Sequence, residues 1–468
     1  MKKTKIVATI GPASDTLEMM ESLIKKGLNV MRLNFSHGSH SEHKIRIQTM
    51  RKAASNMNKN IAILLDTKGP EIRTKKLKNG KEVALRTDDT IILTTDQSHI
   101  GNYDKVAVTY ENLPHDLKPK DTVLLDDGLI ALEVLSIKNN EINCLIKNSG
   151  FLGEDKGLNL PGIHVQLPAL SQKDINDIKF GCEMDVDFIA ASFVRKASDV
   201  QAVKDELKKH GKEEILIISK IENDEGIKNF DEILDFSDGI MVARGDLGVE
   251  IPIEDVPFAQ KNMIEKCNKL GKTVITATQM LESMIKNPRP TRAEAGDVVN
   301  AILDGTDAVM LSGESAKGMY PELAVETMSK ICLRTDNAHE HKTISKNLTM
   351  SEAIASGTVK TAEDIGAKAI VILAESGETA RNIKRLKPNS IVLAITTNLK
   401  TANQLGLSRG VYTTLIDQVK NVEDFHDIAI KITANYKFIN NNDVIVLSSG
   451  ANSAIGITNL MRVDVINK

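Results

Sequence analysis

The sequence predicts an α/β protein built on a (β/α)8 TIM barrel, and three observations support this prediction. Eight short apolar runs rich in Val, Ile and Leu have the composition of strands buried on both faces. Helix-compatible stretches lie between most of them, and a βα unit repeated eight times can close into a barrel. Charged or hydroxyl residues lie at or next to the end of each run, and such barrels carry their chemistry at the carboxyl ends of the strands. The runs are Lys5–Ile10, Val30–Phe35, Ile61–Asp66, Asp187–Ser192, Ile215–Lys220, Gly239–Arg244, Thr273–Thr278 and Ala308–Ser312.

The barrel pattern is interrupted once, after the run that ends at Asp66. From Gly69 to Leu167 the sequence changes to short β-type runs separated by Asn-Gly, Asp-Gly and Asn-Asn turn signals. We expect a small inserted all-β domain at 69–167, with hinges at Gly69-Pro70 and Leu167-Pro168. The two flanking pieces, 1–68 and 168–338, together have about the length of a typical barrel of roughly 250 residues.

The last block, residues 339–468, has a pattern of its own. Ala369–Ala374, Ile391–Thr396, Gly410–Leu415 and Val444–Ser448 are expected to form strands, with helices between them. This alternation predicts a separate α/β domain with a mostly parallel sheet.

Composition and charge exclude several classes of protein. The chain has 468 residues, 41% of them hydrophobic, and a net charge of −3, which argues against a general nucleic-acid or membrane binder. Its four cysteines occur singly, without a CxxC pair, so neither a zinc ribbon nor a disulfide framework is predicted. The beginning of the chain is a poor signal peptide, and no run reaches about 18 apolar residues. We therefore expect a cytoplasmic protein that spans no membrane.

Two pairs of polar residues follow neighbouring strands at a spacing of two. In an extended segment residues two apart point the same way, so Lys220 can lie beside Glu222, and Arg244 beside Asp246. The two carboxylates suit a hard divalent cation such as Mg²⁺, and the lysine suits a phosphoryl group in transfer. The alternative for Lys220 and Glu222 is a buried ion pair without catalytic use, but the second pair one strand later favours a site.

A second group offers mainly neutral oxygens. One carboxylate with several neutral oxygens suits a weakly hydrated monovalent cation better than Mg²⁺. From the residue types alone, helix N-capping is an equally good interpretation of the same residues. The group comprises Asn34, Ser36, Asp66 and Thr67.

Candidate nucleotide contacts are basic residues, because the chain has no Walker-type phosphate loop and no G-x-G-x-x-G after a strand. Arg73 and Lys156, in the predicted insert, are the candidates. For Lys156 the simpler interpretation is a surface lysine without a ligand. His37, His40 and His43 recur every three residues. A solvated helix start explains that spacing better than a metal site, and His37 has the best case for a ligand role.

Nine segments of the chain closely resemble the pyruvate kinases. Their order and specificity extend the resemblance over essentially the whole sequence, most strongly over the barrel. The segments are IGPAS, RLNFSHG, DTKGPEIRT, NLPG, ISKIEN, DGIMVARGDLGVEIP, ATQMLESM, PRPTRAE and DAVMLSGESAKG.

The resemblance implies a glycolytic phosphotransferase that moves the phosphoryl group of phosphoenolpyruvate to ADP, giving pyruvate and ATP. Arg32 would bind the substrate phosphate and Lys220 would stabilise the phosphoryl group in transfer. Gly245 and Asp246 would meet the substrate carboxylate through backbone N–H groups, and Thr278 would lie near the carbon that is protonated.

The resemblance also implies roles for the other two domains, cofactors and an assembly. The insert at 69–167 would be a small β-barrel lid, and the last domain, 339–468, would be regulatory. The cofactors would be Mg²⁺ (or Mn²⁺) and K⁺, and the protein would be a homotetramer. Mg²⁺ would be held by Glu222 and Asp246, K⁺ by Asn34, Ser36, Asp66 and Thr67, and the nucleotide phosphates by Arg73 and Lys156, with His37 as a weaker candidate.

Two positions bear on ion dependence and regulation. Family members that work without potassium carry Lys where this chain has Glu71, so K⁺ dependence is expected. The loop at 374–380 corresponds to the family's sugar-phosphate effector site, but Glu378 places a negative charge in it. The facing loop at 449–453 has no basic residue. Tight activation by fructose 1,6-bisphosphate is therefore not expected, while another sugar phosphate, or no effector, stays open.

Two other functions compete with this interpretation. A magnesium-dependent barrel lyase acting on pyruvate or enolpyruvate would use the same lysine and carboxylates but would need no ADP. A non-catalytic metabolite sensor would not need Lys220, Glu222, Asp246 and Thr278 all intact.

Overall fold

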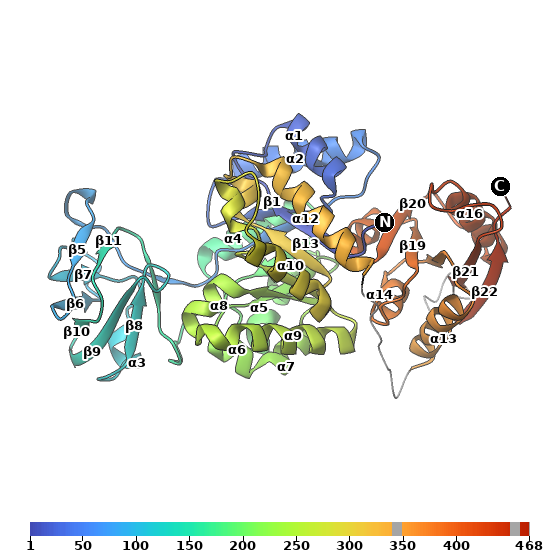
Figure 1. The fold of residues 1–468 in the computed structure, drawn as a ribbon. Helices are drawn as coiled ribbons and strands as arrows, with labels where there is room; N and C mark the ends of the chain where they lie inside the picture. The colour runs from blue at the N-terminus through green and yellow to red at the C-terminus, as the bar shows by residue number, and fades with distance from the viewer. Residues whose placement is uncertain (339–348, 450–458, 468) are drawn as a thin grey trace.

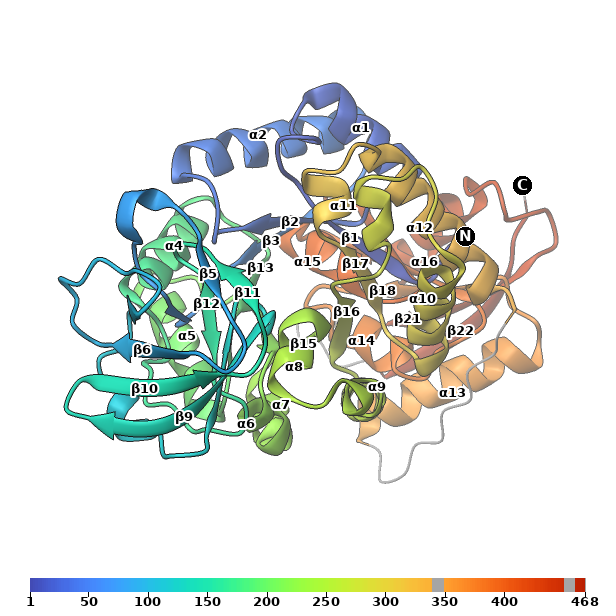
Figure 2. The same ribbon diagram turned by 60° about the vertical axis from the view of Figure 1, so that its left-hand side comes forward.

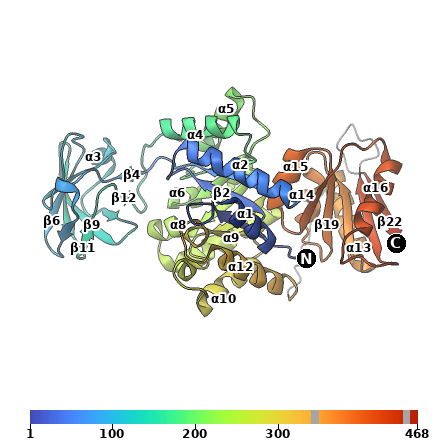
Figure 3. The ribbon, with the colours of Figure 1, turned by 90° about the horizontal axis from the view of Figure 1, so that it is seen from above.

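The computed structural model describes residues 1–338, 349–449 and 459–467. Three parts lie in a row: a small all-β insert, a central barrel and a C-terminal α/β part (Figures 1 and 3). The N-terminus lies between the barrel and the C-terminal part (Figure 3). No helix among the described residues has both the length and the apolar character needed to cross a membrane.

The central part is a closed barrel of parallel strands in the order β1-β17-β16-β15-β14-β13-β3-β2. Most of the strand residues are buried, as expected for strands packed on both faces. Each predicted apolar run coincides with one of these strands to within a residue or two at either end, so the predicted barrel is confirmed. The strands are β1 (Lys5–Thr9), β2 (Val30–Asn34), β3 (Ala62–Asp66), β13 (Phe188–Ala191), β14 (Leu216–Ile221), β15 (Gly239–Ala243), β16 (Thr273–Ala277) and β17 (Ala308–Leu311).

Helices surround the barrel, and several of their starts are set by local sequence. Ser39, Ser171 and Thr291 are N-caps of α2, α4 and α10, and each forms a reciprocal capping box with the acidic residue three positions later. The helices are α1 (Leu17–Lys26), α2 (His40–Asn56), α4 (Gln172–Glu183), α5 (Ala197–Lys209), α6 (Asp224–Lys228), α7 (Phe230–Phe236), α8 (Arg244–Glu250), α9 (Val256–Leu270), α10 (Arg292–Asp304), α11 (Gly313–Ala316) and α12 (Pro321–Asp336).

The insert leaves the barrel after β3 and returns before α4. It contains a seven-stranded sheet in the order β4-β12-β8-β9-β10-β6-β7 and a two-stranded sheet β11-β5, with its own apolar core. Figure 2 shows the long β9–β10 hairpin. Asn79, Asp127 and Asn139, in the predicted turn signals, all have positive φ. The elements are β4 (Ile72–Arg73), β5 (Val83–Leu85), β6 (Thr90–Thr94), β7 (Lys105–Ala107), α3 (Leu113–Asp116), β8 (Thr122–Leu125), β9 (Ile130–Lys138), β10 (Glu141–Ile146), β11 (Gly150–Leu152) and β12 (Gly157–Asn159).

The C-terminal part is a five-stranded sheet in the order β20-β19-β18-β21-β22. The strands β20, β19, β18 and β21 run parallel, and β22 pairs antiparallel with β21. The sheet is therefore mostly parallel, as predicted. The predicted effector loop at 449–453 lies outside the described residues except for Ser449. The elements are α13 (Met350–Asp364), β18 (Ala369–Leu373), α14 (Glu378–Lys384), β19 (Ile391–Thr396), α15 (Leu399–Gln404), β20 (Val411–Leu415), α16 (Val422–Ala434), β21 (Val444–Ser449) and β22 (Leu460–Val465).

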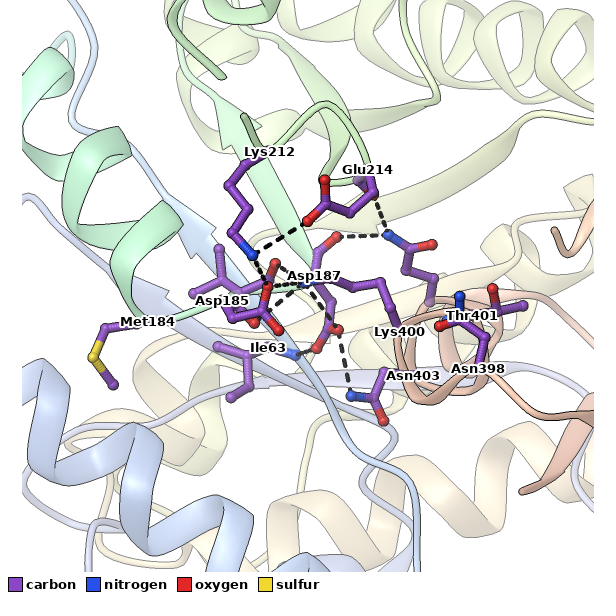
Figure 4. Close-up of polar contacts among 12 residues, drawn as sticks. Ile63, Met184, Asp185, Asp187, Lys212, Glu214, Asn398, Lys400, Thr401 and Asn403 are labelled. Carbon is purple, nitrogen blue, oxygen red and sulfur yellow. Dashed lines mark hydrogen bonds and ion pairs between the residues drawn. The ribbon is translucent and has the colours of Figure 1, made fainter. Parts of the chain in front are cut away.

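The C-terminal part packs against the barrel at the amino ends of the strands. Asp187, just before β13, receives a hydrogen bond from Asn403 at 3.3 Å and lies 4.0 Å from Lys400, both on α15 (Figure 4). Asp307, just before β17, forms a fully buried ion pair with Lys384 of α14 at 2.7 Å. These contacts leave the carboxyl ends of the barrel strands to face the insert.

Candidate active site

A large cavity lies between the insert and the carboxyl ends of the barrel strands. It has a volume of about 490 Å³ and is lined by residues of both parts. Arg73, Asp127 and Lys156 come from the insert, while Asn223 and Asp246 come from the barrel. Such a cleft between two parts of a chain is a common place for a substrate.

Lys220 lies at the end of β14, and its ammonium group is the centre of a buried cluster. Its Nζ donates to Ser192 Oγ at 2.7 Å and lies 3.1 Å from Asp66 Oδ1 and 3.0 Å from Glu222 Oε1. Burial by itself would lower the pKa of Lys220, but the two carboxylates outweigh it and raise the pKa above its ordinary value. Lys220 is therefore a fixed positive charge at the mouth of the barrel.

Asp66, at the end of β3, joins Lys220 to Arg32. The Arg32 Nε donates to Asp66 Oδ2 at 2.5 Å, and Arg32 Nη1 donates to Thr9 Oγ1 at 2.8 Å. Burial opposes the charge of Asp66, but Arg32 and Lys220 together hold its pKa below the ordinary value. The carboxylate thus orients two cations toward the same end of the barrel.

Glu222 and Asp246 provide the two carboxylates predicted to hold Mg²⁺. Glu222 accepts the Phe193 N–H at 2.6 Å, and its pKa is raised by burial and by the charge of Asp246. Asp246 lines the cavity. Within the described chain its carboxylate has no hydrogen-bond or ion-pair partner. Two carboxylates that repel one another, one without a partner, fit a divalent cation.

A metal ion here would need further ligands. No group of three or more His, Cys, Asp or Glu side chains suited to a metal occurs in residues 1–338, 349–449 and 459–467. The donor set of Glu222 and Asp246 nevertheless suits Mg²⁺, which usually binds one or two carboxylates and takes its other ligands from water and substrate phosphate.

Thr278 follows β16 in a strained conformation beside Gly245. Its φ is 64°, which is unfavourable for a β-branched residue, and its Oγ1 accepts the Gly245 N–H at 2.7 Å. Arg244 Nη2 donates to the Thr278 carbonyl at 2.7 Å and also pairs with Asp297 at 2.8 Å. The strain is therefore maintained by specific contacts, as is typical of functional sites.

The four predicted K⁺ ligands come from the ends of β2 and β3. Asn34 lies opposite Asp66 in the strand register, and its Oδ1 accepts the Ser36 N–H at 3.0 Å. Thr67 Oγ1 accepts the Ser192 N–H at 3.1 Å. The N-cap of the following helix is Ser39 and not Ser36. Oxygen ligands of these types suit a monovalent cation. The Asp66 carboxylate, however, already forms ion pairs with Arg32 and Lys220.

The nucleotide candidates separate into two groups. Arg73 and Lys156 line the cavity, where Arg73 pairs with Glu71 at 2.6 Å and Lys156 with Asp126 at 2.9 Å. His37 is exposed, and its side chain does not line this cavity.

The other two histidines of the predicted trio contribute to packing. His40 Nε2 forms a hydrogen bond with Asp177 Oδ1 at 2.7 Å, and His43 is buried and stacks on the Phe35 ring. Their three-residue spacing therefore does not form a metal face.

Ser192 is the main residue that the sequence analysis did not single out. It accepts a hydrogen bond from Lys220 and donates to the Thr67 carbonyl at 2.7 Å. Its position as the hydroxyl at the end of a predicted strand was the available signal, because the same rule identified Asp66 and Thr278.

A closed barrel whose strand ends gather a buried lysine, an arginine and the carboxylates of Glu222 and Asp246 defines a class of enzyme suited to phosphoryl transfer. Residues 1–325 match the pyruvate kinase barrel domain, and residues 352–464 match the pyruvate kinase alpha/beta domain. The chain belongs to the pyruvate kinase family, and its function is the phosphoryl transfer that defines this family.

Individual relatives agree with this assignment. The chain is 50% identical to a pyruvate kinase of Bacillus licheniformis and 49% identical to one of Staphylococcus aureus strain MRSA252, in each case over 100% of this chain and 81% of the relative. A crystal structure of a pyruvate kinase from Cryptosporidium parvum superposes with a TM-score of 0.95 at 42% identity, covering 99% of this chain and 96% of that one. The lyase alternative receives no support from these comparisons.

Proposed function

We propose that Lys220 stabilises the phosphoryl group as it passes from phosphoenolpyruvate to ADP at the carboxyl ends of the barrel strands. The supporting observation is the position of the Lys220 ammonium, 3.0 Å from Glu222 and beside Arg32 and Asp66. The reaction brings two anionic groups together, and each unit charge pair at about 4 Å costs roughly 4 kcal/mol at an effective dielectric near 20. Fixed cations at this point lower that cost during transfer.

The other residues of the strand ends have complementary roles in this proposal. Arg32, held by Asp66, binds the phosphate of phosphoenolpyruvate. A terminal oxygen of ADP bonds to phosphorus as the enol oxygen leaves, and the resulting enolate becomes pyruvate by taking a proton at carbon. Gly245 and Asp246 position the substrate carboxylate, and Thr278 lies near the carbon that receives the proton.

Glu222 and Asp246 hold Mg²⁺ in this proposal, and Asn34, Ser36, Asp66 and Thr67 hold K⁺. Bound Mg²⁺ would neutralise phosphate oxygens and help to align donor and acceptor. Arg73 and Lys156 contact the phosphates of ADP from the insert, after exchanging their present partners Glu71 and Asp126. Movement of the insert over the cavity would exclude water and so favour transfer over hydrolysis.

A homotetramer in the cytoplasm is the proposed assembly and location. The edge strand β22 exposes Met461, Val463 and Val465, and the barrel exposes Ile253 and Phe258, so two apolar surfaces are available for copies of the chain. All four cysteines are free and buried, which suits a reducing compartment.

A sugar-phosphate effector is a weaker proposal. Glu378 begins α14 and is exposed next to the expected phosphate loop, so it disfavours an anion there.

An initial-rate assay tests the proposed reaction. Pyruvate formation from phosphoenolpyruvate should require ADP and Mg²⁺ and should yield ATP in equal amount. Phosphoenolpyruvate turnover that proceeds at the same rate without ADP, or that releases inorganic phosphate in place of ATP, would contradict the proposal.

A further inference from the structure

The last residue of strand β1, Thr9, contributes its side chain to the inside of the barrel mouth. Val7 and Thr9 are two apart on β1, and Val30 and Arg32 are two apart on β2, so each pair points to one side of its strand. Val7 and Val30 belong to an apolar cluster that draws on all eight strands and fills the inside of the barrel. Thr9 lies opposite Arg32 in the strand register, and both are buried. The two side chains therefore form part of a polar layer above that cluster.

The Thr9 hydroxyl makes two hydrogen bonds whose directions are unambiguous. Its Oγ1 donates to the Leu311 carbonyl at 3.0 Å and accepts from Arg32 Nη1 at 2.8 Å. A carbonyl oxygen can only accept and a guanidinium can only donate, so the hydroxyl proton points to Leu311 and a lone pair faces Arg32. The hydroxyl thus joins the ends of β17 and β2, the two strands that flank β1 in the barrel.

The backbone of Thr9 and of the segment after it is held by α11. Ser315 Oγ donates to the Thr9 carbonyl at 2.8 Å, and the Ala13 N–H donates to the Ala316 carbonyl at 3.0 Å. A Cβ on Gly11 would lie 2.7 Å from the same Ala316 oxygen, so the segment packs closely against the helix. The Thr9 hydroxyl is therefore fixed in position before any ligand binds.

Thr9 is the second of two contacts that orient the guanidinium of Arg32. Asp66 Oδ2 accepts from Nε at 2.5 Å, and Thr9 accepts from Nη1. A single hydrogen bond would let the planar group turn about that contact, whereas acceptors at two different nitrogens define its plane. Across the part of the chain that the structure describes, the Arg32 side chain has no further acceptor. Three of its five N–H groups are therefore left for a ligand.

The two acceptors of Arg32 differ in charge, and the difference favours binding of an anion. Asp66 is negative, and its charge is shared between Arg32 and Lys220. Thr9 is neutral, so it orients the guanidinium without offsetting more of its positive charge. A second carboxylate in this position would orient Arg32 equally well but would repel a phosphate.

We propose that Thr9 is a positioning residue for the binding of phosphoenolpyruvate. Its hydroxyl fixes the plane of the Arg32 guanidinium, so that the free N–H groups meet the substrate phosphate without reorganisation. Thr9 acts through Arg32 and needs no contact with the substrate. This inference rests on the proposed function, in which Arg32 binds that phosphate.

Calorimetric titration of the full chain with phosphoenolpyruvate, in Mg²⁺ and K⁺ without ADP, tests the proposal. Thr9→Val nearly keeps the shape of the side chain but removes the hydrogen bond to a charged group, so it should weaken binding by at least about tenfold. Thr9→Ser keeps the hydroxyl and should bind within about threefold of the unmodified protein. Initial rates should show the same rise in the KM for phosphoenolpyruvate in Thr9→Val, with the KM for ADP unchanged.

The order of the two variants separates positioning from packing. Thr9→Ser removes a buried methyl group, so a role in packing alone would make it the more damaging substitution. Positioning predicts the reverse order in substrate affinity. Thr276→Val is the matched control, because Thr276 is a buried threonine of β16 that bonds Thr306 at 3.0 Å and does not line the cavity. Its affinity should equal that of the unmodified protein.

Arg32→Met distinguishes a failure of this inference from a failure of the proposed function. It should weaken binding at least as much as Thr9→Val does, and the double variant should bind no more weakly than Arg32→Met alone, because no guanidinium is left to orient. If circular dichroism shows that Thr9→Val is unfolded, Thr9→Ala, which also lacks the hydroxyl, should show the same loss.

Unchanged binding in Arg32→Met would refute the proposed role of Arg32 and this inference with it. Two results would overturn the inference alone. In the first, Arg32→Met weakens binding but the folded Thr9 variant without a hydroxyl does not. In the second, Thr9→Ser weakens binding as much as that variant.

Discussion

Lys220 Nζ lies 3.0 Å from Glu222 Oε1, and this contact joins the predicted phosphoryl-stabilising cation to the predicted Mg²⁺ ligand. The sequence spacing left two interpretations open, a structural ion pair or a site. The structure shows that the ion pair exists and that it lies at the strand ends, next to Asp66 and Arg32. The contact is therefore compatible with both interpretations, and the catalytic use of the pair stays a prediction.

The buried carboxyl group of Asp187 should make the stability of the protein depend on pH. Burial raises the pKa of Asp187 to about 6, above the value of about 3.9 expected in the unfolded chain. The folded state therefore holds a proton that the unfolded state releases, so this group's contribution is most favourable below about pH 4 and is lost as the pH rises to about 6.

Asp187→Asn should abolish this pH dependence and raise the stability near pH 7 by on the order of 2 kcal/mol. An asparagine oxygen can still accept the Ile63 N–H, which bonds Asp187 at 2.8 Å. Urea unfolding from pH 4 to 7.5 measures the difference between the two proteins. A difference that stays constant over this range would contradict the assignment, as would a variant that is less stable at pH 7.

Gly69, at the first hinge, should be required both for its backbone conformation and because a side chain there would contact Ser192 and Phe193. Gly69 and Gly80 both have positive φ, at 76° and 65°. A Cβ on Gly69 would lie 2.8 Å from Ser192 Cβ and from Phe193 Cδ2, whereas a Cβ on Gly80 would meet nothing within 4 Å. Ser192 and Phe193 hold Lys220 and Glu222, so displacement at Gly69 would reach the site.

Gly80→Ala should therefore cost about 1 kcal/mol of stability with unchanged turnover. Gly69→Ala should cost more stability and should also lower turnover. Thermal unfolding and initial rates on both variants check this difference. Equal effects of the two substitutions would show that contact with Ser192 and Phe193 is unimportant.

The buried ion pair between Lys384 and Asp307 should be a principal link between the barrel and the C-terminal part. Both side chains are almost fully buried, so Lys384→Met would leave Asp307 without its cation and should cost about 3 kcal/mol. The exposed pair of Lys360 and Asp364 provides the control, because Lys360→Met should change stability by less than about 0.5 kcal/mol. Similar shifts in the urea midpoint for both variants would argue against the link.

Potassium should be required for full activity, because position 71 carries a carboxylate and no ammonium group. Glu71 pairs with Lys68 at 2.8 Å and with Arg73 at 2.6 Å. Replacing K⁺ by Na⁺ or Li⁺ at equal ionic strength should lower the rate severalfold, and Glu71→Lys should reduce this preference. Glu82→Lys, on an exposed residue of the insert, should leave it unchanged. Full activity in Na⁺ or Li⁺ alone would refute the requirement.

Most of the barrel and much of the site could be predicted from the sequence for one physical reason. Parallel strands that are buried on both faces appear as continuous apolar runs, and their carboxyl ends meet at one end of the barrel. The polar residues that follow the runs, such as Lys220 and Asp66, therefore had to lie close together.

Contacts that depend on tertiary packing could not be predicted in this way. Arg244 meets Asp297, more than fifty positions later, through the packing of α10 near the strand ends. Asp187 and Asp307 begin predicted strands, but nothing local indicates that α15 and α14 cover them. The spacing of His40 and His43 indicated a helix start, whereas Phe35 and Asp177 decide where their rings lie.

The most direct test of the central role of Lys220 is the turnover of Lys220→Met with saturating substrates. We predict a loss of at least about a thousandfold, because the methionine removes the cation that stabilises the group in transfer. Lys330→Met, on an exposed lysine of α12, should retain full turnover, and circular dichroism should show that both variants are folded. A folded Lys220→Met protein that loses less than about tenfold would contradict the account.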